Sequence, residues 1–565
     1  MTPSMPGTWP TVAAIIRKRL DYIGIALAVF FTHGLLLLND GIYWDDWLWL
    51  KADGLSLNRE AIDKTAAQMG AMPNSMIPLW LSQWLGYRQV AFLSILAIGL
   101  LTYAVASRTK LLSRCEGFLL ALITLTYPAF QTWIVFATTR YIFCLAMFLL
   151  ACLLALKAEE LRGARHVTLR VLALMSFFLS FDLNSLLCFY LGFVLVMIFL
   201  HRTENPGEPY RNTLYFLLRK PDYMILPIIF WIIKKVFYPV SGLYANYNNF
   251  RLEPRSIAEC LLKFIYHGVL QQFHEAFRLL IGMPLIWIAA LLLVIGASRM
   301  SDKLRGRDES AAFCGHGNPW GLALFGAVLY LLASAPYIAV GLSPSVHGWK
   351  TRHALLIGIP VGLLLLSIVR LVFRSSSGLK RILRLVFITT IVSAFFLSTL
   401  SAYLSWQARW VRDRSLMIHL AGMTQGRENS FFLIDDQYRL GGEKIYGFYE
   451  WTTIFKKVWG NERRLGVDQG IYVPNSLFDP RKYPRVTERN LSEFDPYGCQ
   501  AILHIRRGSG STDEPRLVAR YYYYKYLGSS PQKLRSFLES ITDVSIENVY
   551  SAKAVHCSRD KGNAM

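Results

Sequence analysis

Two adjacent carboxylates, Asp45 and Asp46, stand in the segment YWDDWLWL directly after the first long apolar run of the chain. A carboxylate at the mouth of a membrane span can act as a general base that takes the proton of a hydroxyl group. Two neighbouring carboxylates can also hold a divalent cation such as Mg²⁺ or Mn²⁺ against a phosphate. The competing interpretation is that both acids are solvated loop residues. The flanking Trp44 and Trp47 make the segment amphipathic and therefore favour a site.

The tryptophans of this segment have an interpretation of their own. Trp44, Trp47 and Trp49 follow a span closely, and Trp and Tyr gather at membrane–water interfaces. Aromatic faces also line carbohydrate-binding sites. The sequence favours an interfacial belt and does not separate the two interpretations.

Cations at the mouths of later apolar runs form a second group of candidates. Arg140 and Tyr141 begin one run, and an arginine there either binds an anion or extends its side chain to the interface. Lys234 and Lys235 lie near the end of PIIFWIIKKVFYPV, where two lysines cannot both face lipid without cost. Because neighbours on a helix point about 100° apart, one lysine can meet a lipid phosphate while the other extends to the interface.

Two further segments carry polar side chains between apolar runs. The segment HGWKTRHALL contains His347, Lys350 and Arg352, and arginine is suited to bidentate contacts with phosphate. A solvated loop is the competing interpretation for these three residues. Asp182, in SFDLNSLL, is favoured as a turn former, and it becomes a second acid beside the first pair if the turn faces a cavity.

The elements that must position these residues are membrane helices. The chain has 565 residues, of which 53% are hydrophobic and 17% charged, and its mean hydropathy is +0.32. A helix needs about 20 apolar residues to cross the hydrocarbon core, and such runs recur as far as residue 404. We therefore predict an α-helical polytopic membrane protein. The eleven predicted spans cover residues 22–38, 90–106, 118–136, 142–156, 171–181, 185–200, 223–238, 279–297, 322–340, 354–373 and 386–404.

The basic residues predict the orientation. The net charge of +22 is concentrated in short segments between alternate spans, which is the positive-inside pattern and requires no nucleic-acid partner. This pattern predicts a cytoplasmic N-terminus and an extracytoplasmic side that carries the acid pair, Arg140, Asp182 and the segment around Arg352. The basic segments cover residues 17–19, 108–114, 162–170, 202–220, 299–307 and 374–384.

The chain after residue 404 is predicted to be a soluble, extracytoplasmic α/β domain, so that the domains are 1–404 and 405–565. Residues 430–436, 500–507 and 518–527 read as strands, and 530–541 as a helix that begins with Ser-Pro. A second acid pair, Asp435 and Asp436, follows the first of these strands and is interpreted as structural. Cys499 and Cys557 can form a disulfide if this domain is extracytoplasmic.

These motifs together resemble the GT-C glycosyltransferases, which are polytopic enzymes that use a polyprenyl-phosphate-linked sugar as donor. The family carries an acidic motif in its first extracytoplasmic loop, and WDDW is similar to it. The segment ATTRYIFCLAMFLLACLLALKA looks like the family's Arg-Tyr entry to the fourth span, and HGWKTRHALLIGIP is similar to the basic entry to a late span in bacterial members. A soluble C-terminal domain outside the membrane also fits.

The resemblance implies an inverting glycosyltransferase of the bacterial inner membrane with its active site on the periplasmic side. Asp45 or Asp46 would serve as base or cation ligand, and Arg140, Lys234, Lys235, Lys350 and Arg352 would supply contacts for the donor phosphate. Trp44, Trp47, Tyr141, Asp182 and His347 are further candidates. The acceptor would be a glycan, a lipid or a protein. A transporter or flippase, a polymerase or ligase for lipid-linked glycans, and a membrane scaffold are the alternatives.

Overall fold

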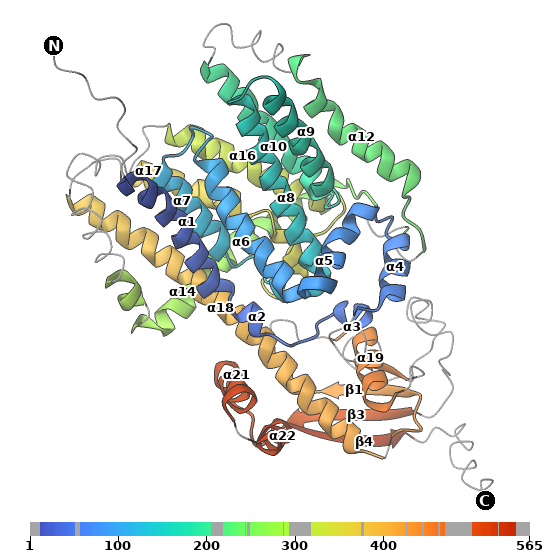
Figure 1. Cartoon of the computed structure of the whole chain (residues 1–565). Helices are drawn as coiled ribbons and strands as arrows, with labels where there is room; N and C mark the ends of the chain where they lie inside the picture. Colours follow the sequence, from blue (N-terminus) through green and yellow to red (C-terminus); the bar gives the residue numbers. More distant parts are fainter. Residues whose placement is uncertain are drawn as a thin grey trace, which may run out of the picture.

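The computed structural model describes residues 12–50, 57–204, 218–242, 245, 249–285, 287–292, 318–373, 378–424, 426–441, 446–460, 464–468, 500–528 and 530–549. Figure 1 shows a bundle of helices joined to a smaller domain that is built around a sheet. Cys499, Cys557 and the predicted basic segment at 299–307 lie outside the described residues.

Among the described residues, five helices are long and apolar enough to cross a membrane, and two apolar helical segments, 20–33 and 358–372, are shorter. The chain is therefore a helical membrane protein with several apolar spans. The five are α6 (Tyr87–Ala106), α8 (Phe136–Glu159), α10 (Ser185–Glu204), α16 (Pro319–Ile338) and α18 (Gly378–Gly422). The other bundle helices are α1 (Val12–His33), α2 (Leu35–Leu38), α7 (Arg114–Thr126), α9 (Ala164–Ser180), α12 (Pro221–Phe237) and α17 (Gly358–Val372).

Several predicted spans are not single helices. The predicted span 22–38 is divided at Gly34 between α1 and α2. Helix α7 ends at Thr126, and the predicted span 118–136 continues through an irregular segment and the short helix η2 (Thr132–Ile134). Pro128 explains the break, because proline has no amide hydrogen and restricts the residue before it. In the predicted span 279–297, helix α14 ends at Gly282, just before Pro284, and residues 293–297 lie outside the described part.

Short helices connect the spans at the end of the bundle where α8 begins. The opening loop after α2 contains α3 (Asp46–Trp49), α4 (Arg59–Gln68), η1 (Pro73–Met76) and α5 (Ile77–Leu85). A later connection contains α13 (Pro254–Ile265), η4 (Tyr266–Leu270) and α14 (Gln271–Gly282).

Helix α18 joins the two parts of the molecule. The predicted span 386–404 lies within it, and the helix continues without interruption to Gly422, where it packs against the sheet domain. A continuous helix has no flexible linker at the predicted boundary. A helix extends by about 1.5 Å per residue, so the part of α18 beyond residue 404 reaches out of the bundle. This part of the helix positions the sheet domain against the opening loop.

The C-terminal sheet has the strand order β2-β1-β3-β4. Strand β1 pairs in parallel with β2 and β3, whereas β4 is antiparallel to β3. Helix α19 forms the crossover from β1 to β2, as a parallel connection requires. The elements are β1 (Phe431–Asp436), α19 (Phe448–Trp459), β2 (Leu465–Asp468), β3 (Gln500–Arg507), α21 (Glu514–Tyr522), η8 (Tyr523–Leu527), α22 (Pro531–Glu539) and β4 (Thr542–Val549).

The mixed α/β composition is confirmed, as are the predicted strands β1 and β3 and the helix α22. The predicted strand at 518–527 is wrong, because these residues form the end of α21 and η8. Their many aromatic residues favour a strand locally. The buried residues Leu517, Val518 and Tyr521 follow a helical spacing instead, and α21 packs along α18. Tertiary packing therefore overrides the local preference.

Candidate functional site

The turn that carries the acid pair is held by contacts from distant segments. Asn39 accepts a hydrogen bond from the Gly41 amide at 2.9 Å and donates one to Gln407 of α18 at 2.5 Å. The Tyr43 hydroxyl donates to the Trp406 carbonyl oxygen at 2.9 Å. The turn is thus fixed to the part of α18 beyond residue 404, and Asp45 follows the turn directly.

Trp44 has a strained backbone. Its φ of +46° lies in the left-handed region, which a bulky side chain rarely adopts. Such a conformation costs on the order of 1–3 kcal/mol, persists only where surrounding contacts enforce it, and is concentrated at functional sites. Here the Trp44 amide donates to Glu450 Oε1 at 3.3 Å, and the indole ring lies 4.7 Å from that of Trp406 and 5.0 Å from that of Trp349.

Asp46 caps the first turn of α8. Its two carboxylate oxygens accept hydrogen bonds from the amides of Phe136 (2.9 Å) and Ala137 (3.0 Å), and the residue is fully buried. Burial raises the pKa of Asp46 to about 7, although both amide hydrogen bonds act to lower it. A general base must reach the proton that it takes. Asp46 therefore serves to position α8, and it does not fit a substrate-facing role.

Asp45 is the member of the pair that is partly exposed. It precedes α3. Its backbone carbonyl oxygen accepts hydrogen bonds from the amides of Leu48 and Trp49, and these bonds form the first turn of that helix. Because Asp46 is enclosed and fully bonded to amides, the arrangement does not fit a cation shared by both carboxylates. The described residues also contain no group of three or more His, Cys, Asp or Glu residues that could hold a metal ion.

Asp46→Asn is expected to lower the stability of the protein by about 1–2 kcal/mol. An asparagine has one acceptor oxygen, so its NH₂ group would face one of the two amide hydrogens and α8 would lose half of its cap. Thermal unfolding in detergent measures the effect, with Asp45→Asn as the matched control. An unchanged unfolding temperature for Asp46→Asn would contradict the capping role.

The tryptophans of the opening segment are buried and do not form an interfacial belt. Trp44, Trp47 and Trp49 are 3%, 3% and 7% exposed. Trp47 packs against Trp410 of α18 at 6.0 Å between ring centroids, and Lys457 of α19 lies 5.9 Å from the Trp47 ring. The belt interpretation is therefore wrong for these residues, because α18 and α19 cover Trp44 and Trp47, and Phe136 of α8 packs against Trp49.

Arg140 lies in the first turn of α8, close to the amides that Asp46 caps. Its guanidinium is 5.0 Å from the Tyr141 ring, and one nitrogen lies 3.9 Å from the sulfur of Met69. Its Nε is buried without a hydrogen-bond partner among the described residues. A small pocket is lined by Arg140, by Phe136 and Ala137, and by residues of the opening loop. The structure thus places this cation beside the opening loop.

Lys234 and Lys235 point in different directions. Lys234 donates a hydrogen bond to Asn184 Oδ1 at 3.1 Å and lies 4.0 Å from an Asp182 oxygen. The Asp182 side chain is only 4% exposed, so the turn faces inward, and it interacts electrostatically with Arg140. Lys235 is exposed and lies 4.8 Å from the Trp231 ring. Arg140, Asp182 and Lys234 therefore form one cluster, and Lys235 lies outside it.

The segment around Arg352 approaches the acid pair through an aromatic contact. The Arg352 guanidinium lies 4.2 Å from the Trp349 ring, and that ring packs against Trp44. His347 lies 3.4 Å from Gln131, and Lys350 is exposed. Arg352 therefore lies one aromatic layer from the turn that presents Asp45.

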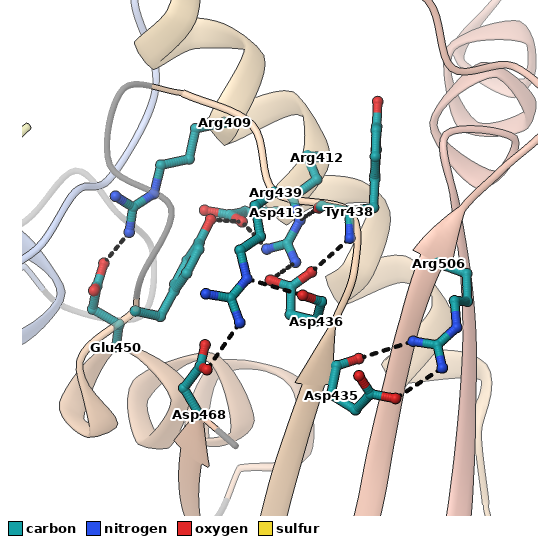
Figure 2. Close-up of polar contacts among 11 residues, drawn as sticks. Arg409, Arg412, Asp413, Asp435, Asp436, Tyr438, Arg439, Glu450, Asp468 and Arg506 are labelled. Atoms are coloured by element: carbon teal, nitrogen blue, oxygen red, sulfur yellow. Dashed lines mark hydrogen bonds and ion pairs between the residues drawn. The ribbon is translucent and has the colours of Figure 1, made fainter. Parts of the chain in front are cut away.

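Sequence reasoning missed three charged residues that hold the opening loop. Arg88, at the start of α6, is buried and donates to the Gly41 carbonyl at 2.6 Å. Arg409 and Glu450 are fully buried and form an ion pair at 2.6 Å, which Figure 2 shows between α18 and α19. A lone arginine in the apolar context LGYRQVAFL was the available signal for Arg88. No local pattern marks the other two.

Comparisons with known proteins give only a distant likeness. No protein-family model and no curated protein matches the sequence. Among solved structures, the chain is similar to ArnT from Cupriavidus metallidurans bound to undecaprenyl phosphate, with 11% identity, 90% of this chain and 95% of that chain covered, and a TM-score of 0.40. The same protein in the apo state gives 11% identity over the same shares with a TM-score of 0.37. At this level of similarity the comparison assigns no function to the chain.

Proposed function

We propose that the chain is a membrane glycosyltransferase that moves a sugar from a polyprenyl-phosphate donor to a hydroxyl group of a glycan, lipid or protein. One observation carries the proposal: a partly exposed carboxylate, Asp45, is presented on a strained and tightly held turn at the same end of the bundle as a half-buried cationic cluster. The cluster consists of Arg140 and Lys234 with Asp182 between them. An acid and cations in this arrangement match a base and a phosphate site.

The reaction is a single displacement. Asp45 takes the proton of the acceptor hydroxyl, the acceptor oxygen forms a bond with the anomeric carbon, and the bond from that carbon to the phosphate oxygen breaks. Arg140 and Lys234 stabilise the negative charge on the departing polyprenyl phosphate, as preorganised cations do. A single displacement inverts the anomeric carbon. By the distribution of basic residues, this site faces the extracytoplasmic side.

The proposal is tested by supplying proteoliposomes of the full chain with a panel of polyprenyl-phosphate hexoses and pentoses and measuring the release of free polyprenyl phosphate. Release that requires an acceptor is the expected result. A flippase would move the intact donor between leaflets and release nothing, so transport without cleavage of any donor would contradict the proposal.

The two adjacent lysines give a sharp test of the phosphate site. Lys234→Ala is expected to weaken binding of polyprenyl phosphate by about 10- to 100-fold, since a hydrogen bond to a charged group contributes about 1.5–3 kcal/mol. Lys235→Ala is the matched control and is expected to change affinity by less than about twofold, because its exposed side chain contributes little. Affinity is measured with polyprenyl phosphate itself by native mass spectrometry. Equal losses in both variants would contradict the assignment.

A further inference from the structure

The C-terminal domain carries an exposed aromatic surface on its tyrosine-rich turn. In the segment RYYYYKYL, Tyr523, Tyr526 and Leu527 are 57%, 54% and 77% exposed. The opposite face of the preceding helix, α21, is buried against α18 through Val518 and Tyr521. A domain surrounded by water has no reason to expose three large side chains on one short turn.

The position of this turn is fixed at the end of the first span. The Tyr521 hydroxyl and the Lys525 ammonium both donate to Asp40 Oδ2, at 2.6 Å and 2.9 Å. Burial raises the pKa of Asp40, but these hydrogen bonds and one from Gln407 outweigh it and hold that pKa below its usual value. Asp40 stands two residues after α2, which ends at Leu38. Figure 1 likewise shows α21 beside α18, close to the point where α18 passes α2.

A second exposed apolar surface lies on α5, the last helix of the opening loop. In α5, Trp84 and Leu85 are 87% and 51% exposed, and Leu85 is the last residue of that helix. Helix α6 starts at Tyr87, whose hydroxyl donates to the Gly41 carbonyl at 3.3 Å. This contact joins the start of α6, three residues after Trp84, to the residue that follows Asp40. Both exposed surfaces therefore belong to segments that contact the chain at Asp40 and Gly41.

We infer that the turn Tyr523–Leu527 docks into the interfacial layer of the bilayer beside the first span and, together with the end of α5, anchors the C-terminal domain to the membrane surface. Tyrosine and tryptophan are the side chains that favour this layer, because one end of each is apolar and the other forms hydrogen bonds. Leu37 and Leu38 of α2, three and two residues before Asp40, are themselves 37% and 46% exposed. The residues of η8 are thus held, through Asp40, next to exposed apolar residues at the end of the first span, and this favours lipid over a protein partner.

A photo-crosslinking amino acid tests the inference in the full chain. It is placed in turn at Tyr526, Leu527 and Trp84, and in a control at Glu547 on β4, whose exposed side chain lies on the sheet. The protein is reconstituted into vesicles of phosphatidylethanolamine and phosphatidylglycerol, irradiated and analysed by mass spectrometry. Because all four side chains are exposed, the substitutions leave the packed core unchanged.

The expected result is a phospholipid adduct at Tyr526, Leu527 and Trp84, with none above background at Glu547. An adduct at Trp84 without one at Tyr526 or Leu527 would overturn the inference. The adduct at Trp84 would show that the method detects lipid contacts of this protein, and the missing adducts would show that Tyr523–Leu527 has none. Adducts between two protein chains at Tyr526 in place of lipid adducts would also overturn it. None of these outcomes depends on whether the chain transfers a sugar.

Discussion

Asp45→Asn is expected to reduce glycosyl transfer by about 10²- to 10⁴-fold, which is the usual contribution of a positioned general base. An amide occupies the same volume as the carboxylate but does not take a proton at neutral pH. Asp45 is the partly exposed member of the pair, and the turn that presents it is held by Glu450, Trp349 and Trp406. The rate of polyprenyl phosphate release in proteoliposomes measures the effect.

Asp46→Asn is the companion variant that gives this result its meaning. Its carboxylate caps α8, so the loss is expected in the unfolding temperature, and transfer at a permissive temperature is expected to fall much less than in Asp45→Asn. Donor binding is measured in both variants to separate chemistry from assembly. Full transfer activity in Asp45→Asn, with normal donor binding, would contradict the role of that residue as base.

Asp436→Ala is expected to destabilise the C-terminal domain by about 3–5 kcal/mol, the usual cost of removing one member of a buried ion pair. Asp436, the last residue of β1, forms an ion pair with Arg412 of α18, and both side chains are fully buried. Arg412 also contacts Asp413 at 3.1 Å and donates to the Tyr438 carbonyl oxygen at 3.0 Å. Figure 2 shows this group of contacts between the helix and the sheet.

Asp435→Ala is the matched control for this prediction. Asp435 is adjacent in sequence, but its partners Arg506 and His504 are partly exposed, with side chains 37% and 24% accessible. The Arg506 guanidinium, more than any other group, lowers the pKa of Asp435. Because exposed ion pairs contribute about 0–1 kcal/mol, Asp435→Ala is expected to have a small effect.

Pulse proteolysis of the full chain across a urea series measures both variants through cleavage of the C-terminal domain. The buried pair fixes the sheet to α18, and α18 and α19 together hold the opening loop through Arg409 and Glu450. Asp436→Ala is therefore expected to reduce transfer indirectly as well. Equal midpoints for Asp435→Ala and Asp436→Ala would show that Arg412 does not depend on Asp436.

The sequence by itself determined the features that depend on local pattern. Long apolar runs identified the chain as a membrane protein. Short runs of strand-forming residues, bounded by turn residues, located β1 and β3. Ser530-Pro531 marked the start of α22, since proline is tolerated in the first turn of a helix. The position of Asp45 and Asp46 directly after the first span was also readable, because span length alone defines it.

Only the tertiary structure decided which of two adjacent residues has which role. Asp46 is enclosed because α8, 90 residues later in the chain, brings two amides to it, whereas Asp45 remains partly exposed. Lys234 is separated from Lys235 by its contacts with Asp182 and Asn184, about 50 residues earlier in the chain. Neither distinction is present in the local pattern, since each neighbouring pair has the same residue type and the same surroundings in sequence.

The tryptophans and the tyrosine-rich turn show the same physical reason in opposite directions. Trp44 and Trp47 have the composition of an interfacial belt, yet α18 and α19 bury them. Residues 518–527 have the composition of a strand, yet packing along α18 makes them helical and leaves Tyr523 and Tyr526 exposed beside the first span. In both cases the free energy of contacts between distant segments exceeds the local preference of the chain, and those contacts exist only in the folded molecule.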